Sequence, residues 1–129
     1  NAFIQMALAP NTGATWLLPR LLGMTKAFEL LYTGDWLTAE EASKLGLFNK
    51  LVPPEDLEKE TMALARKIAK QAPIPIRMMK AQVYRGLETN FDAILDLAGD
   101  AEMICVKTED HKEALAAFRE KREPVFKGR

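Results

Sequence analysis

The sequence has few residues of the kinds that form disulfides or bind metals: one cysteine, Cys105, and one histidine, His111. A single cysteine cannot form an internal disulfide, which fits a reducing compartment, so we expect a cytoplasmic protein. His111 has no cysteine or acidic partner at the spacing of metal ligands, so we expect no metal site. Cys105 falls on the apolar face of an expected helix, where a cysteine is more often buried and inert than catalytic.

Neither sign of charge is in excess, because 18 basic residues balance 18 acidic residues. Such a chain has no basic surface for phosphate backbones or anionic lipids, so we expect no nucleic-acid partner. Charges interrupt every apolar run well short of the roughly 20 residues of a membrane helix, so we expect a soluble protein. The opening NAFIQMALAP lacks the features of a targeting peptide, and we expect further sequence before Asn1.

Helical periodicity covers most of the sequence, and proline and glycine divide it into segments. The clearest segment runs from Pro54 to Ala72, where apolar residues recur at helical spacing after a first turn rich in acids. We expect helices over residues 14–22, 25–32, 38–46, 54–72 and 110–122, with two more that begin at Pro75 and near Asn90.

Two helix starts carry the pattern of a capping box, in which a polar side chain and an acid three residues later bind each other's backbone N–H groups. The first pairs Thr38 with Glu41, and the second pairs Asp110 with Glu113. Two short apolar segments, residues 2–8 and 48–52, are bounded by turn residues and predict strands.

The chain is therefore predicted to be mainly α, with six to seven helices and one or two short strands. At 129 residues it is one folding unit by length. Helices with such wide apolar faces need a surface to pack on, and further chain or a partner subunit would provide it.

Several segments resemble, in order and spacing, the enoyl-CoA hydratase/isomerase (crotonase) family. PNTGATWLLPRLLG at residues 10–23 is similar to the family signature that ends in Leu-Pro-Arg-x-x-Gly. LYTGDWLTAEEA and LGLFNKLVP follow at residues 31–42 and 45–53. Lys80 matches a mid-helix lysine of the family, and AFREKREPVF at residues 117–126 resembles its closing helix. The segment from Thr15 to Arg20 looks closest to the ring-acyl-CoA isomerases of the family.

The resemblance implies a fragment of the α/β crotonase fold, which is a superhelix of ββα turns. The chain would be its C-terminal region, with residues 1–52 as the end of the spiral core and residues 53–129 as a helical capping and oligomerisation region. It implies an acyl-CoA substrate, coenzyme A as part of that substrate rather than a separate cofactor, and a homo-oligomer such as a trimer or hexamer.

The implied reaction passes through an enolate, which two backbone N–H groups stabilise at the thioester oxygen. In the family these donors precede the point where this chain begins. The family's two downstream carboxylates would align with Phe3 and Asn11, neither of which can act as a general base. Asn11 is then either a pocket residue at the family's aspartate position or simply a good turn residue.

Three further residues are candidates for substrate binding. Trp16 either lines the acyl pocket or packs in the core. Phe118 and Lys121 lie three positions apart on the last helix, where the family approaches the adenine and phosphates of coenzyme A. They either bind that nucleotide or are a core phenylalanine and a solvated lysine.

Three functions remain open at this point. The first is an isomerase or hydratase acting on an acyl-CoA when full length, with this isolated chain inactive. The second is a catalytically reduced CoA-binding or oligomerisation scaffold, which the loss of both carboxylates at Phe3 and Asn11 would explain. The third is an unrelated helical interaction module.

Overall fold

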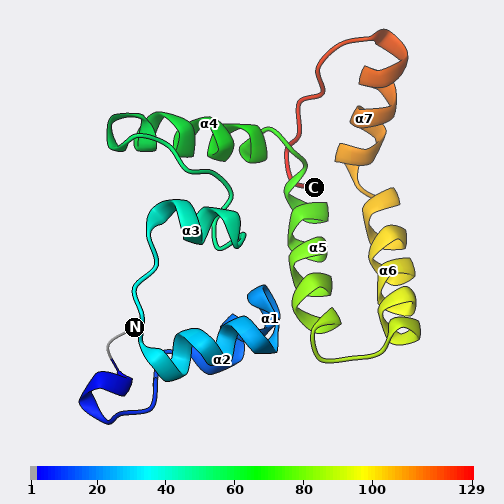
Figure 1. Cartoon of the computed structure of the whole chain (residues 1–129). Helices are drawn as coiled ribbons and strands as arrows, with labels where there is room; N and C mark the ends of the chain where they lie inside the picture. The colour runs from blue at the N-terminus through cyan, green and yellow to red at the C-terminus, as the bar shows by residue number, and fades with distance from the viewer. Residues whose placement is uncertain (1–2) are drawn as a thin grey trace. The chain divides into compact units, whose positions relative to one another are not determined.

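A computed structural model describes residues 3–129, and within this range it contains seven α-helices, two 3-10 turns and no strand (Figure 1). These residues divide into two compact units, one that ends at Leu57 and one from Glu58 to Arg129. The prediction of a mainly α chain with six to seven helices is confirmed. The prediction of strands is wrong.

The first unit is built around two packed helices. It contains η1 (Ile4–Met6), α1 (Ala14–Leu22), α2 (Met24–Thr33), α3 (Ala39–Lys44) and η2 (Pro54–Asp56). Gly23 separates α1 from α2 with a φ of 76°, a backbone conformation that suits glycine. The two helices pack together, and Ala27 and Leu30 of α2 are buried.

The second unit contains α4 (Leu57–Ala69) except its first residue, together with α5 (Pro73–Gly86), α6 (Phe91–Val106) and α7 (Glu109–Glu120). Helices α5 and α6 pack side by side, and α6 also contacts α7 (Figure 1). Helix α5 begins at Pro73, two residues before the expected Pro75, because a proline in the first turn needs no intrahelical partner for its nitrogen. Cys105 is a free, half-buried residue of α6.

Both expected strands have a different structure. Residues 4–6 form the η1 turn, which ends at Ala7 in the left-handed conformation, and residues 48–52 form a bend followed by residues without regular secondary structure. Ala2, also expected in the first strand, lies outside the described residues. A strand must pair its backbone N–H and C=O groups with a neighbour, and residues 3–129 contain none.

Two of the expected helix starts are confirmed. Thr38 and Glu41 form the capping box of α3, with the Thr38 N–H 2.8 Å from the Glu41 carboxylate and the Glu41 N–H 3.2 Å from the Thr38 hydroxyl. The Glu41 carboxylate accepts bonds from the Thr38 N–H and, at 2.9 Å, from the Thr38 hydroxyl, and both lower the pKa of Glu41 because they favour its charged form. Asn90 caps α6 and accepts a bond of 2.9 Å from the Ala93 N–H.

The capping box expected at Asp110 is wrong. Helix α7 begins at Glu109, and Thr108 caps it by accepting a bond of 3.0 Å from the His111 N–H. Asp110 is instead 2% exposed and accepts bonds from the chain's C-terminal residues, at 2.6 Å from the Lys127 N–H and 2.8 Å from the Gly128 N–H. Because threonine is itself a good N-cap, the aspartate two residues later is free to hold the tail.

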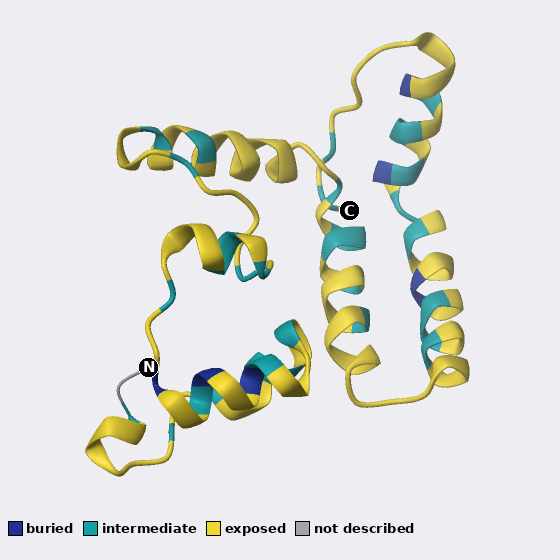
Figure 2. Cartoon of the chain, in the orientation of Figure 1, coloured by how far each residue is buried: buried dark blue, intermediate teal, exposed yellow. Residues whose placement is uncertain are grey.

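The described residues bury little apolar surface, as the exposed colouring in Figure 2 shows. The buried hydrophobic residues are all alanines except one leucine: Ala27, Leu30, Ala101 and Ala117. Large apolar side chains along the helices remain exposed, which fits the expectation that these faces need a further surface to pack on. Within residues 3–129, none of the helices is long and apolar enough to cross a membrane.

The buried Asp110 carboxylate should contribute strongly to stability. Replacing it by alanine in the full-length protein removes the acceptor of two backbone N–H groups, so we expect Asp110→Ala to lower the free energy of unfolding by about 2–3 kcal/mol. Urea unfolding followed by circular dichroism measures this. The matched control is Asp96→Ala at an exposed position of α6, which should change it little. Equal stability of the two variants would contradict the assignment.

Candidate functional site

The turn before α1 holds Asn11, which we expected at the position of the family aspartate. Gly13 caps α1 with a φ of 78° and leaves the backbone there in a left-handed conformation. Asn11 is exposed, and its side chain has no hydrogen-bond partner within residues 3–129. Its amide is therefore available to a ligand, and the alternatives of a pocket residue and a turn residue both stay predictions.

Trp16 lies on α1 and is covered by an arginine of the same helix. The Arg20 guanidinium carbon is 3.8 Å from the Trp16 ring centroid, and Arg20 also donates a bond of 2.9 Å to the Trp16 carbonyl. This cation–π pair occupies one face of the ring. Trp16 is 36% exposed and therefore does not lie in a core formed by residues 3–129.

An apolar cavity of about 470 Å³ lies within the first unit. Pro10, Thr15 and Pro19 line it from the signature segment, and Phe28 and Tyr32 of α2, whose rings stack at 5.1 Å, line it from another side. Its remaining lining residues come from the first turn and from α2: Ile4, Ala7, Leu8, Ala9, Met24, Ala27 and Leu31.

Neither Asn11 nor Trp16 is part of that lining, so the structure does not bring Trp16 into this cavity. Phe3 is half-buried at the start of η1 and is also absent from the lining. The cavity has the size and apolar character of a small-molecule pocket, and its polar component among these residues is slight.

The other two candidates stand at the end of α7, in the second unit. Phe118 is 84% exposed, which excludes a core role among the described residues. Lys121 follows the helix with φ 54° and ψ 39°, in the left-handed region. It forms no ion pair with any residue from 3 to 129. The two side chains are therefore open to a ligand or a partner.

The backbone at this helix end forms a Schellman motif, in which two N–H groups return to carbonyls of the last turn. The Arg122 N–H lies 3.0 Å from the Ala117 carbonyl, and the Lys121 N–H lies 3.3 Å from the Phe118 carbonyl. Lys121 occupies the left-handed position that glycine usually takes.

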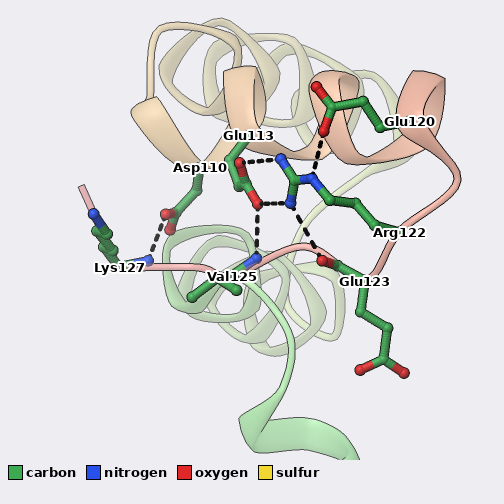
Figure 3. A network of polar contacts seen from close by, with 7 residues as sticks. All are labelled: Asp110, Glu113, Glu120, Arg122, Glu123, Val125 and Lys127. Carbon is green, nitrogen blue, oxygen red and sulfur yellow. Dashed lines mark hydrogen bonds and ion pairs between the residues drawn. The ribbon is translucent and has the colours of Figure 1, made fainter.

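Arg122 anchors this helix end through two acids (Figure 3). Its two terminal nitrogens meet the Glu113 carboxylate at 2.5 and 2.9 Å, a bidentate arrangement, and its Nε lies 2.6 Å from Glu120. Glu113 also accepts a bond of 2.9 Å from the Val125 N–H. The same pair of residues therefore fixes the end of α7 and the chain that follows it.

The charges in this network favour their ionised forms. The hydrogen bonds from Arg122 and then from the Val125 N–H lower the pKa of Glu113 to about 2. The bonds to Glu113 and Glu120 raise the pKa of Arg122 further above its usual range. Arg122 and Glu113 are thus a permanent ion pair at neutral pH.

Sequence reasoning missed the roles of Asp110, Glu113 and Arg122 because it interpreted the two acids as a capping box. Thr108 was the one signal in the sequence that could have corrected this, because a threonine N-cap at that position leaves Asp110 and Glu113 available for other bonds. Among the described residues no cluster of three or more metal-ligating side chains is present, and His111 is half-buried in the first turn of α7.

The low pKa of Glu113 predicts how the network responds to acid. A carboxyl whose pKa falls on folding stabilises the protein above its unfolded value of 4.5, and this stabilisation is lost as pH falls from about 4.5 toward 2. The thermal midpoints of the full-length protein and its Glu113→Gln variant should therefore differ at pH 6 and converge toward about pH 2. A Glu113 carboxyl that titrates near 4.5 by NMR would contradict this.

The profile of the family described as Enoyl-CoA hydratase/isomerase matches residues 1–129. Crotonyl-CoA hydratase of Syntrophomonas wolfei is 38% identical over 95% of this chain and 47% of its own length. The 1,2-epoxyphenylacetyl-CoA isomerase of Escherichia coli is 36% identical over 99% of this chain and 49% of its own length.

Solved structures agree with these sequence relatives. The crystal structure of an enoyl-CoA hydratase from Bacillus anthracis superposes with a TM-score of 0.94 at 37% identity, over 98% of this chain and 49% of that one. The chain spans about half the length of these three relatives. The expectation that it corresponds to their C-terminal half stays a prediction.

Proposed function

Because the chain belongs to the enoyl-CoA hydratase/isomerase family, we propose that the full-length protein is an isomerase or hydratase that acts on an acyl-CoA thioester through an enolate. The observation that carries this proposal is the match of the family profile to every residue of the chain, 1–129. Relatives of both reaction types share more than a third of their aligned residues with it, so the proposal includes both reactions.

The chemistry requires donors at the thioester oxygen and a group that moves a proton at the α-carbon. Two backbone N–H groups would stabilise the enolate oxygen, and they would come from parts of the fold that this chain does not include. Phe3 cannot transfer a proton. Asn11 can orient water or a carbonyl by hydrogen bonding but cannot act as a base. A carboxylate elsewhere in the full-length protein would then move the proton.

We assign the nucleotide end of the substrate to the end of α7. The exposure of Phe118 and the absence of an ionic partner for Lys121 support this, because an aromatic ring can stack on adenine and an ammonium group can bind a phosphate. We assign the acyl group to the cavity of about 470 Å³, whose apolar lining suits a hydrocarbon chain.

The exposed apolar faces of the helices support a homo-oligomer or an intramolecular cover in the full-length protein. We also propose that the isolated chain is inactive, because the proposed donors at the thioester oxygen lie outside it. The isolated chain is therefore expected to turn over no enoyl-CoA in a spectrophotometric assay, and measurable turnover would contradict the assignment of those donors.

A second candidate is a catalytically reduced homologue that binds CoA thioesters or serves as an oligomer scaffold. Phe3 and Asn11 favour it, because neither retains a carboxylate at the family positions. The two candidates differ in turnover, so one turnover assay of the full-length protein separates them.

We expect the full-length protein to turn over members of an enoyl-CoA panel, and Asn11→Asp to raise its isomerase rate by about tenfold or more, because a carboxylate at this turn can accept the α-proton. Asn90→Asp is the matched control, since aspartate also caps a helix and Asn90 belongs to the other unit. Binding without turnover by the parent and by Asn11→Asp would favour the scaffold.

A further inference from the structure

Helix α7 ends on a strained residue. Lys121 and Ala7 are the non-glycine residues with positive φ within residues 3–129, each with a φ of 54°. By contrast, α2 is followed by Gly34 with a φ of 70°. Side chains disfavour this conformation and glycine does not, so a lysine here is less stable than a glycine would be. Backbone strain that is retained at a ligand-accessible position points to a role for the side chain.

The strain is offset by the residue that follows. In many Schellman motifs an apolar contact closes the turn. Here the residue after the left-handed position is Arg122. Its bidentate pair with Glu113 and its bond to Glu120 close the turn in place of an apolar contact. The Val125 N–H on Glu113 ties the next part of the chain to the same carboxylate, as Figure 3 shows.

The left-handed conformation also sets the direction of the lysine. A φ of 54° in place of the helical value turns the Cα–Cβ bond of Lys121 by roughly 120° about the N–Cα axis. The ion pairs of Arg122 also affect the charges near Lys121. Arg122 binds both Glu113 and Glu120, so these two carboxylates are already paired. The Lys121 ammonium group is left without an acidic partner among the described residues.

We propose that the Glu113–Arg122 pair is a positioning device: it holds Lys121 in the left-handed conformation and aims its ammonium group at the phosphates of the acyl-CoA nucleotide. This inference rests on the proposed function, in which the end of α7 binds that nucleotide. Glu113 and Arg122 are positioning residues, since they act through Lys121 and do not touch the substrate.

Binding to two thioesters separates positioning from general stability. The probes are butyryl-CoA, which carries the nucleotide, and butyrylpantetheine, which lacks it; both are saturated and cannot be hydrated. Affinities are measured by calorimetry on the full-length protein. Glu113→Gln removes the charge of one partner, and Arg122→Lys keeps the charge of the other but loses the bidentate geometry. Glu109→Gln, on the same helix with an exposed ion pair to Arg129, is the matched control.

Glu113→Gln and Arg122→Lys are expected to weaken butyryl-CoA binding by about threefold to tenfold and to leave butyrylpantetheine binding unchanged, because only the nucleotide reaches Lys121. Glu109→Gln is expected to change neither affinity. Equal losses for both probes, or no loss for either, would overturn the positioning role.

Lys121 itself separates this inference from the proposed function. Lys121→Met should weaken butyryl-CoA binding; if it does and the pair variants do not, the nucleotide contact stands and the positioning role fails. If Lys121→Met leaves butyryl-CoA binding unchanged, the nucleotide contact fails and the positioning role with it.

Lys121→Gly should raise Tm by removing the strain while weakening butyryl-CoA binding, and a glycine variant that binds like the parent would also overturn the inference.

Discussion

The structure depends on one constraint: its helices carry far more apolar surface than they bury among themselves. Among residues 3–129, the buried hydrophobic residues are three alanines and Leu30, while residues as large as Trp36, Phe91 and Phe118 stay at least 73% exposed. Amphipathic helices gain most of their stability from packing, so faces like these imply a further surface that covers them. The chain spans about half the length of these relatives, and in our proposal the other half of the full-length protein provides part of this surface.

The polar network at the end of α7 is held by hydrogen bonds and ion pairs rather than by large buried apolar side chains. Asp110, buried at 2% exposure, holds the chain's last residues, and Glu113 with Arg122 closes the helix. Charge-assisted bonds are strong enough to order a short tail where apolar contacts are few. This leaves Phe118 and Lys121 at the edge of an ordered element, where a ligand can reach both.

Sequence patterns predicted the features that depend on neighbouring residues. Glycines on both sides fixed α1 at residues 14–22, and Thr38 with Glu41 fixed the start of α3. Patterns failed where a distant partner decides. Residues 4–8 have the composition of a strand but no strand beside them in the described chain, and Asp110 binds N–H groups 17 and 18 positions away, which no local rule anticipates. Asn11 and Lys121 are candidates that come from the resemblance and stay predictions, whereas the left-handed conformation of Lys121 required the structure.

We propose that this chain forms one part of an acyl-CoA enzyme whose remaining parts cover its apolar helices. A crystal structure of the full-length protein with a bound enoyl-CoA tests it most directly. The account predicts that the exposed apolar faces of α1 and α2 are buried there and that Lys121 contacts a phosphate of the nucleotide. Helices that stay uncovered, with no thioester bound against them, would contradict it.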